Sequence, residues 1–145
     1  MDLFYLAIVQ LIITWIMTGI MWFSQIIHYP LYMKIREGFI EYERSYIRRS
    51  AILLGPLILI EALTAIILIG MAKEGILIKL AGVNLILLIL IWLSTFLFQT
   101  TQHQKLSIRF SKKILQGLIH FNWVRTILWT AKGVVMFFFL KSLFF

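Results

Sequence analysis

Four long apolar stretches set the pattern of the chain. They cover residues 3–27, 51–72, 76–98 and 121–143. A helix that crosses a bilayer needs roughly 20 mostly apolar residues, and each stretch is long enough. The pattern predicts an all-α integral membrane protein, a four-transmembrane-helix bundle that forms a single domain over residues 1–145.

The amino-acid composition supports this prediction and excludes a water-soluble domain. Hydrophobic residues make up 61% of the 145 residues and the mean hydropathy is +0.94, whereas a soluble domain is about 45–50% apolar. The sequence has no cysteine. Disulfides, thiolate catalysis and cysteine-ligated metal centres are therefore excluded as function classes.

Positive charge gathers in two of the three connections. The loop between the first two stretches contains Lys34, Arg36, Arg44, Arg48 and Arg49, and the loop before the fourth contains Lys105, Arg109, Lys112 and Lys113. By the positive-inside rule, loops 28–50 and 99–120 are cytoplasmic and both termini lie outside the plasma (inner) membrane. The net charge of +8 thus reflects topology, and nucleic-acid binding is not predicted.

Both basic loops contain amphipathic helical patterns. Apolar residues at Ile35, Phe39, Tyr42 and Tyr46, and then at Leu106, Phe110, Ile114, Leu118 and Phe121, follow helical spacing. Ser111 is a suitable N-cap for a helix that runs into the fourth stretch. These cytoplasmic segments, after helix 1 and before helix 4, either lie on the membrane surface or extend the spans and pack on each other.

Two prolines interrupt the apolar stretches. Pro30 is expected to end the first span, because proline disfavours continued helix. Pro56 lies inside the second span, where it is expected to kink the helix and free the carbonyl of Ile52.

Two ionisable residues lie deep within the predicted spans. Glu61 is about ten residues into the second span and Lys132 about eleven into the fourth, which places both roughly 15 Å from the cytoplasmic end. An ion pair is the simplest way for a bilayer to tolerate both. The pair is either a structural clamp between helices or a functional site that relays protons or anchors a substrate.

Three spans present polar stripes that converge toward the cytoplasmic end. The fourth contains Asn122, Arg125, Trp129, Lys132 and Met136, the first contains Trp15, Thr18, Trp22 and Gln25 followed by His28 or Tyr29, and the third contains Trp92, Thr95 or Phe96, Gln99 and His103. The stripes predict a cavity whose substrate-binding candidates are Trp22, Gln25, Trp92, Gln99, Asn122 and Trp129. A hydrogen-bonded core without a ligand is the alternative.

All three histidines fall on the cytoplasmic side. Among them, His28 and His103 form the best pair of candidate ligands for a metal ion or haem. His120 faces away from the stripe of the fourth span, so it is the weakest candidate.

Several of these residues form motifs that resemble a known group of proteins. His28-Tyr29-Pro30, Gln99-x-x-x-His103 and Asn122-Trp123-x-Arg125-Thr126-x-x-Trp129 resemble a family of small bacterial four-span membrane proteins without an assigned function. In size and layout the chain is also distantly similar to the HemJ-type protoporphyrinogen oxidases and to the anthrone-oxygenase-like family. That similarity implies a four-helix membrane fold and a flat aromatic substrate.

Three functions remain open at this point. The first is binding or oxidation of a hydrophobic, aromatic or anionic, small molecule, with Glu61, Lys132 and Arg125 as catalytic candidates. The second is a structural or accessory subunit of a larger membrane complex, in which the Glu61–Lys132 pair is only a clamp. The third is a small homo-oligomeric transporter or proton pathway.

Overall fold

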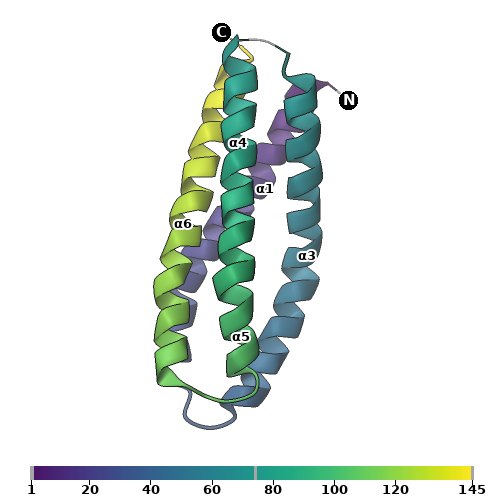
Figure 1. The fold of residues 1–145 in the computed structure, drawn as a ribbon. Helices are drawn as coiled ribbons and strands as arrows, with labels where there is room; N and C mark the ends of the chain where they lie inside the picture. Colours follow the sequence, from purple (N-terminus) through teal and green to yellow (C-terminus); the bar gives the residue numbers. More distant parts are fainter. Residues whose placement is uncertain (1, 74, 145) are drawn as a thin grey trace.

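The bundle consists of four long helical rods, each antiparallel to the rod before it in the chain. The computed structural model describes residues 2–73 and 75–144, and within these residues the chain forms helices and contains no strand (Figure 1). The rods cover Leu3–Tyr32, Phe39–Met71, Gly75–Leu106 and Lys112–Lys141, and each is long and apolar enough to cross a membrane. The structure thus confirms the four apolar helices that the sequence predicts.

Two of the rods contain a π-helical turn. The first comprises α1 (Leu3–Phe23), the π-turn η1 (Ser24–His28) and α2 (Tyr29–Tyr32), and the third comprises α4 (Gly75–Ser94), the π-turn η2 (Thr95–Gln99) and α5 (Thr100–Leu106). The other two rods are the single helices α3 (Phe39–Met71) and α6 (Lys112–Lys141). A π-turn accommodates one residue more than an α-turn does, so it rotates every later side chain around the rod axis.

The helices extend further toward the basic loops than the sequence predicts. Pro30 was expected to end the first span, but this expectation is wrong, because the rod continues to Tyr32. The physical reason is the π-turn η1 directly before the proline: the Tyr29 N–H bonds to the Ser24 carbonyl, five residues back. This wider turn leaves room for the proline ring, which lacks an N–H to donate.

The segments on either side of the basic loops are continuous with the spans. Helix α3 begins at Phe39 and passes through Pro56 without a break. Helix α6 begins at Lys112, and the Ser111 hydroxyl accepts a hydrogen bond from the Ile114 N–H at 3.4 Å, which confirms the predicted N-cap. Phe110 lies outside that helix, in the loop 107–111, so the apolar pattern from residue 106 to 121 does not form one helix.

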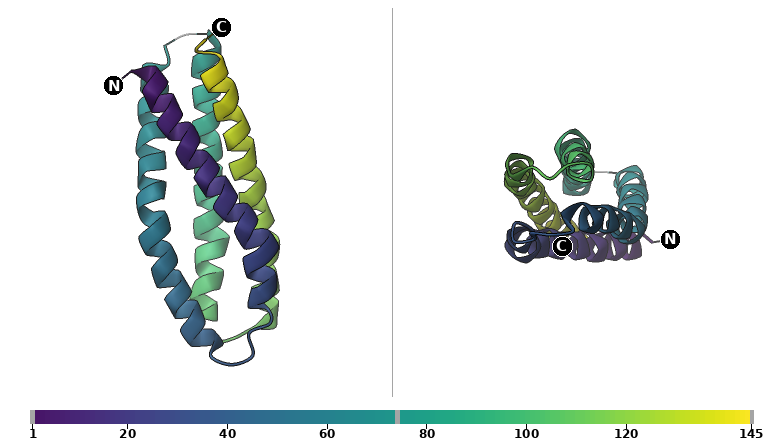
Figure 2. Two further views of the ribbon diagram at one scale, coloured as in Figure 1. Left: turned by 180° about the vertical axis from the view of Figure 1, so that it is seen from behind. Right: turned by 90° about the horizontal axis from the view of Figure 1, so that it is seen from below.

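The rods surround a common core. Helix α1 packs against α3 and α6, and α4 packs against the same two helices. Figure 2 shows α1 crossing the bundle obliquely between α3 and α6. The loops at residues 33–38 and 107–111 share one end, which we call the basic-loop end, and the described terminal residues lie at the opposite end.

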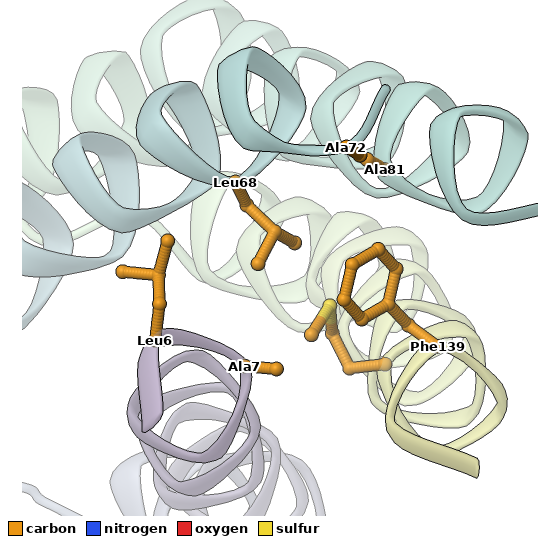
Figure 3. Close-up of a cluster of buried hydrophobic side chains, with 7 residues drawn as sticks. Leu6, Ala7, Leu68, Ala72, Ala81 and Phe139 are labelled. Carbon is orange, nitrogen blue, oxygen red and sulfur yellow. The ribbon is translucent and has the colours of Figure 1, made fainter. Parts of the chain in front are cut away.

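The buried side chains form three layers along the bundle. The layer near the termini includes Leu6, Ala7, Leu68, Ala81 and Phe139 from all of the long helices (Figure 3). A middle layer is centred on Met17, Ala65 and Trp129, and a third layer at the basic-loop end contains Tyr29, Tyr32 and Leu118. Polar side chains lie between these apolar layers, and they form the candidate sites.

Candidate functional site

A buried polar network at mid-bundle contains the predicted ion pair. Lys132 Nζ contacts Glu61 Oε1, which confirms the pairing that the sequence predicts. The same carboxylate oxygen accepts hydrogen bonds from Gln10 Nε2 at 3.0 Å and from the Thr14 hydroxyl at 2.7 Å, and Lys132 also donates to Thr14 at 3.2 Å. The Thr64 hydroxyl donates to Gln10. The network thus joins α1, α3 and α6.

This network is sealed from the surroundings. Glu61, Lys132, Gln10 and Thr14 have no exposed surface, and none of them lines the cavity described below. The opposite charges compensate each other, and the ring of Trp129 lies 5.8 Å from Lys132 Nζ. The arrangement suits a structural clamp, because a buried charge is tolerated when it is both paired and hydrogen-bonded.

A cavity of about 330 Å³ opens at the basic-loop end. Its apolar wall includes Ile20, Met21, Ile47, Leu54 and Ile58. Its polar wall includes Ser24, Tyr29, Tyr46, Gln99, His103 and Arg125. Residues from all four rods meet there. The third rod contributes through η2 and α5 and not through α4.

Arg125 is the cation of this cavity. Arg125 is 8% exposed, and its Nη1 donates a long hydrogen bond to the side-chain oxygen Oδ1 of Asn122 at 3.5 Å. Its Nε has no hydrogen-bond partner among residues 2–73 and 75–144. Among the described residues, the carboxylates that contact a basic side chain are Glu61, with Lys132, and Glu43, with His103, so no carboxylate neutralises Arg125. A guanidinium in this state is suited to bind an anionic group.

Two of the predicted binding residues support Arg125 from behind. Asn122 Nδ2 donates to Gln25 Oε1 at 2.8 Å, and Gln25 Nε2 donates to the Ile119 carbonyl at 3.3 Å. Both side chains are buried, and neither lines the cavity. They hold the position of the Asn122 oxygen that faces Arg125.

Gln99 is the predicted binding residue that does line the cavity. Its Nε2 donates to the Leu118 carbonyl at 3.2 Å, and its Oε1 accepts a long hydrogen bond from the Tyr29 hydroxyl at 3.5 Å. The amide therefore fixes the orientation of a tyrosine that shares the cavity wall. Of the two alternatives His28 or Tyr29, the structure places Tyr29 in this wall.

The tryptophans lie elsewhere, and none that the structure describes lines the cavity. Trp22 is exposed and packs edge-on against Trp123 at 5.7 Å, while Trp92 packs against Phe96 at 6.1 Å. Trp129 is buried in the middle core layer. The π-turns η1 and η2 come after Trp22 and Trp92, so the residues that follow each turn are rotated away from the α-helical spacing that the predicted stripes of the first and third spans assume.

The two candidate histidines, His28 and His103, both lie next to the ring of Tyr46. No group of three His, Cys, Asp or Glu residues that could hold a metal ion occurs within residues 2–73 and 75–144. The Tyr46 ring stacks on His28 at 4.7 Å and lies 5.4 Å from His103. His103 Nδ1 is already engaged by a carboxylate. Ligation of a metal ion or a haem by His28 and His103 stays a prediction.

Glu43 is the important residue that sequence reasoning missed. It is buried on α3, and its Oε1 lies 2.6 Å from His103 Nδ1. Its position carried a signal, because it lies four residues after Phe39 and three before Tyr46, on the apolar face of the predicted helix. A carboxylate in such a face needs a partner.

Comparison of the sequence with family models and curated proteins, and of the fold with solved structures, finds no significant match.

Proposed function

We propose that the chain is a multi-pass membrane protein that binds a hydrophobic small molecule through an anionic group in the cavity at the basic-loop end. The observation that carries this proposal is Arg125, a buried cation in the cavity wall that no carboxylate neutralises. The apolar wall would contact the body of the ligand, and the guanidinium would bind its charged end.

The outer surface of the bundle supports insertion in a bilayer. Large apolar side chains are exposed along the middle of the helices, for example Ile52, Leu63, Ile66 and Ile86. An apolar surface of this extent is unfavourable in water and favourable in lipid. The clustering of Lys and Arg at one end supports a cytoplasmic position for the basic-loop end, with residues 39–50 and 112–120 near the lipid headgroups.

The cavity has the properties of a small-molecule site. A volume of about 330 Å³ falls at the lower end of the range of roughly 300–1,000 Å³ that is usual for ligand pockets. Most of the surface area of the wall is apolar, and its polar side chains come from all four rods. Such a wall favours a compact hydrophobic ligand whose polar part lies at one end.

The electrostatic argument gives the sign of the ligand charge. Removing a guanidinium from water is costly unless an anion and hydrogen-bond acceptors replace the water. Asn122 supplies one long contact, and Nε of Arg125 remains without a partner. A carboxylate can accept two parallel hydrogen bonds from the guanidinium, and a phenolate can accept one short hydrogen bond.

A pair of matched probes tests the proposal. The protein is placed in nanodiscs of zwitterionic phosphatidylcholine, and quenching of tryptophan fluorescence is measured with 1-pyrenebutyrate and with the uncharged 1-pyrenebutanol. We expect saturable binding of the anion alone, with Arg125→Gln weakening it by roughly tenfold or more, since a hydrogen bond to a charged group contributes about 1.5–3 kcal/mol.

The control separates the cavity from the general positive charge of the protein. Arg48 is exposed on α3 and lies outside the cavity wall, so Arg48→Gln removes the same charge and should leave the affinity unchanged. Equal affinity for both probes, or equal losses in Arg125→Gln and Arg48→Gln, would contradict the proposal.

The mid-bundle pair has a different role in this proposal. Because Glu61 and Lys132 neutralise each other and are fully buried, they hold α3 and α6 together and take no part in ligand binding.

A further inference from the structure

The cavity wall contains a histidine whose orientation is set by a buried carboxylate. His103 lines the cavity, and its Nδ1 lies 2.6 Å from Oε1 of Glu43. Glu43 has no exposed surface, and its second oxygen has no hydrogen-bond partner. The second ring nitrogen of His103, Nε2, forms no hydrogen bond to any described residue, so it is available for a proton.

A carboxylate–histidine pair of this geometry has a known physical consequence. The carboxylate fixes the ring and its tautomer, and it stabilises the imidazolium that forms when Nε2 takes up a proton. The other ionisable groups around the cavity are Tyr29, Tyr46 and Arg125, together with His28, which stacks on Tyr46. Glu43 is therefore the one described carboxylate that contacts His103.

We propose that the cavity takes up a hydrophobic weak acid in its neutral form and ionises it, with His103 as the proton acceptor and Arg125 as the partner of the anion. Glu43 acts through His103, so it is a positioning residue. This inference rests on the proposed function, and it adds the ligand class, a weak acid, and the destination of its proton.

The proposed step is balanced without a further reactant. The O–H bond of the bound acid breaks, its electron pair stays on the oxygen, and an N–H bond forms at Nε2 of His103. Before the step, the site contains the Glu43 carboxylate and the unpaired Arg125 guanidinium; afterwards it contains two ion pairs, Glu43 with imidazolium and Arg125 with the ligand anion.

The difference in lipid solubility between a neutral acid and its anion explains why this step would favour capture of the acid. A neutral acid dissolves in the hydrocarbon far more readily than its anion does, because an isolated charge is poorly solvated there. Both charges produced by ionisation find a partner within the cavity wall. The protein can therefore collect the acid from the lipid in neutral form and retain it as an ion.

The experiment follows the proton with a chromogenic weak acid. Wild-type protein in phosphatidylcholine nanodiscs is titrated with 4-nitrophenol at a pH below the pKa of the free phenol, and the visible absorbance of the phenolate is recorded. Calorimetry in buffers of different ionisation enthalpy gives the number of protons released. We expect the bound probe to be phenolate, with close to zero protons released, because His103 keeps the proton.

Variants of the dyad identify the acceptor. In His103→Gln the bound probe should either stay neutral or release about one proton per molecule to the buffer. Glu43→Gln should change the result in the same direction, and Glu43→Asp should partly restore it. Arg48→Gln serves as the surface control and should behave as wild type.

Two results would overturn the inference. One is release of about one proton per bound phenolate by the wild type itself, and the other is a His103→Gln variant that matches the wild type in both absorbance and proton count. Binding of 1-pyrenebutyrate, which is already ionised, reports the Arg125 site alone and also shows that each variant is folded. If the His103 and Glu43 variants bind 1-pyrenebutyrate and behave as wild type with 4-nitrophenol, only the inference is contradicted. If the wild type does not bind 1-pyrenebutyrate, the proposed function is contradicted.

Discussion

The mid-bundle network and the cavity at the basic-loop end differ in whether their buried cation has a carboxylate partner. At mid-bundle, Lys132 contacts Glu61, and Gln10 and Thr14 complete the hydrogen bonds of the shared carboxylate oxygen. In the cavity, Arg125 has one long contact to Asn122 and no carboxylate. Both cations lie on α6, separated by seven residues, so the same helix supplies a compensated charge and an uncompensated one.

This difference shows which of the two regions is suited to bind a ligand. A pair of opposite charges without exposed surface has no net charge that would attract a further ion. An uncompensated cation beside a cavity gains stabilisation from any anion that fits. The depth of a charge along the bundle therefore says less about its role than whether it has a partner.

The sealed region should respond most strongly to loss of one partner. Glu61→Gln leaves Lys132 buried without its counter-ion, so we expect the free energy of unfolding to fall by about 3–5 kcal/mol. Unfolding by sodium dodecyl sulfate in mixed micelles measures this loss. Glu41→Gln, on the exposed start of α3, is the matched control, and Glu61→Gln combined with Lys132→Met should lose less than Glu61→Gln alone. A single variant as stable as Glu41→Gln would refute the clamp.

The cavity should instead respond to a change of volume. Ser24 is buried, lines the cavity and makes no side-chain hydrogen bond to the described residues. In Ser24→Leu the larger side chain occupies ligand space, so we expect 1-pyrenebutyrate affinity to fall by roughly tenfold, or about 1.4 kcal/mol, with little change in stability. Fluorescence titration measures the affinity, and Ser24→Ala, which removes only the hydroxyl, should bind as wild type. Unchanged affinity in Ser24→Leu would place the ligand elsewhere.

A glycine tests how closely α1 and α6 pack beside the sealed network. A Cβ at Gly133 would lie 3.0 Å from the Trp15 ring, whereas a Cβ at Gly70 would meet nothing within 4 Å. Because the Trp15 ring must give way by a few tenths of an ångström, Gly133→Ala should leave the protein less stable than Gly70→Ala does, by about 1 kcal/mol of unfolding free energy. Gly70→Ala should not destabilise, since alanine favours helix more than glycine does. Equal effects of both substitutions would mean that α1 and α6 are less closely packed than the structure describes.

The smallest expected effect concerns an exposed hydrogen bond between the same two helices, α1 and α6. Trp22 Nε1 donates to the Thr130 hydroxyl at 3.0 Å. Trp22→Phe removes the donor and should cost about 0.6 kcal/mol of stability, the average for such bonds between membrane helices, without changing 1-pyrenebutyrate affinity. A clear loss of affinity would show that Trp22 belongs to the binding site after all.

The accuracy of the sequence-based predictions follows the local helix geometry. The Glu61–Lys132 contact was predictable because residues 51–71 and 121–141 are regular α-helix, so depth follows directly from residue number. The residues of the third rod near the cavity were harder to place. Gln99 was identified, but the η2 turn separates it from Trp92, and Trp92 does not share its cavity. One extra residue in a turn rotates later side chains by roughly 100°.

The Glu43–His103 dyad depends on the tertiary structure even more strongly. The two residues are 60 positions apart and belong to α3 and α5. The sequence identifies His103 as a histidine near the end of a span. For Glu43, the only signal in the sequence is its place within an apolar helix face, and neither signal predicts that the two residues pair. The pairing requires that α3 extend past the span to Phe39, and sequence periodicity left that extension as one of two alternatives.

The sequence by itself determined the four apolar helices, their antiparallel connection through two basic loops and the depth of the mid-bundle ion pair. These properties depend on the length and composition of local segments, because the hydrophobic effect acts on each apolar helix separately. Only the tertiary structure decided which polar side chains share a cavity, because that depends on the rotation of each helix about its own axis. Two π-turns and the packing of α3 against α5 set that rotation, and they leave Arg125 facing the cavity without a carboxylate partner.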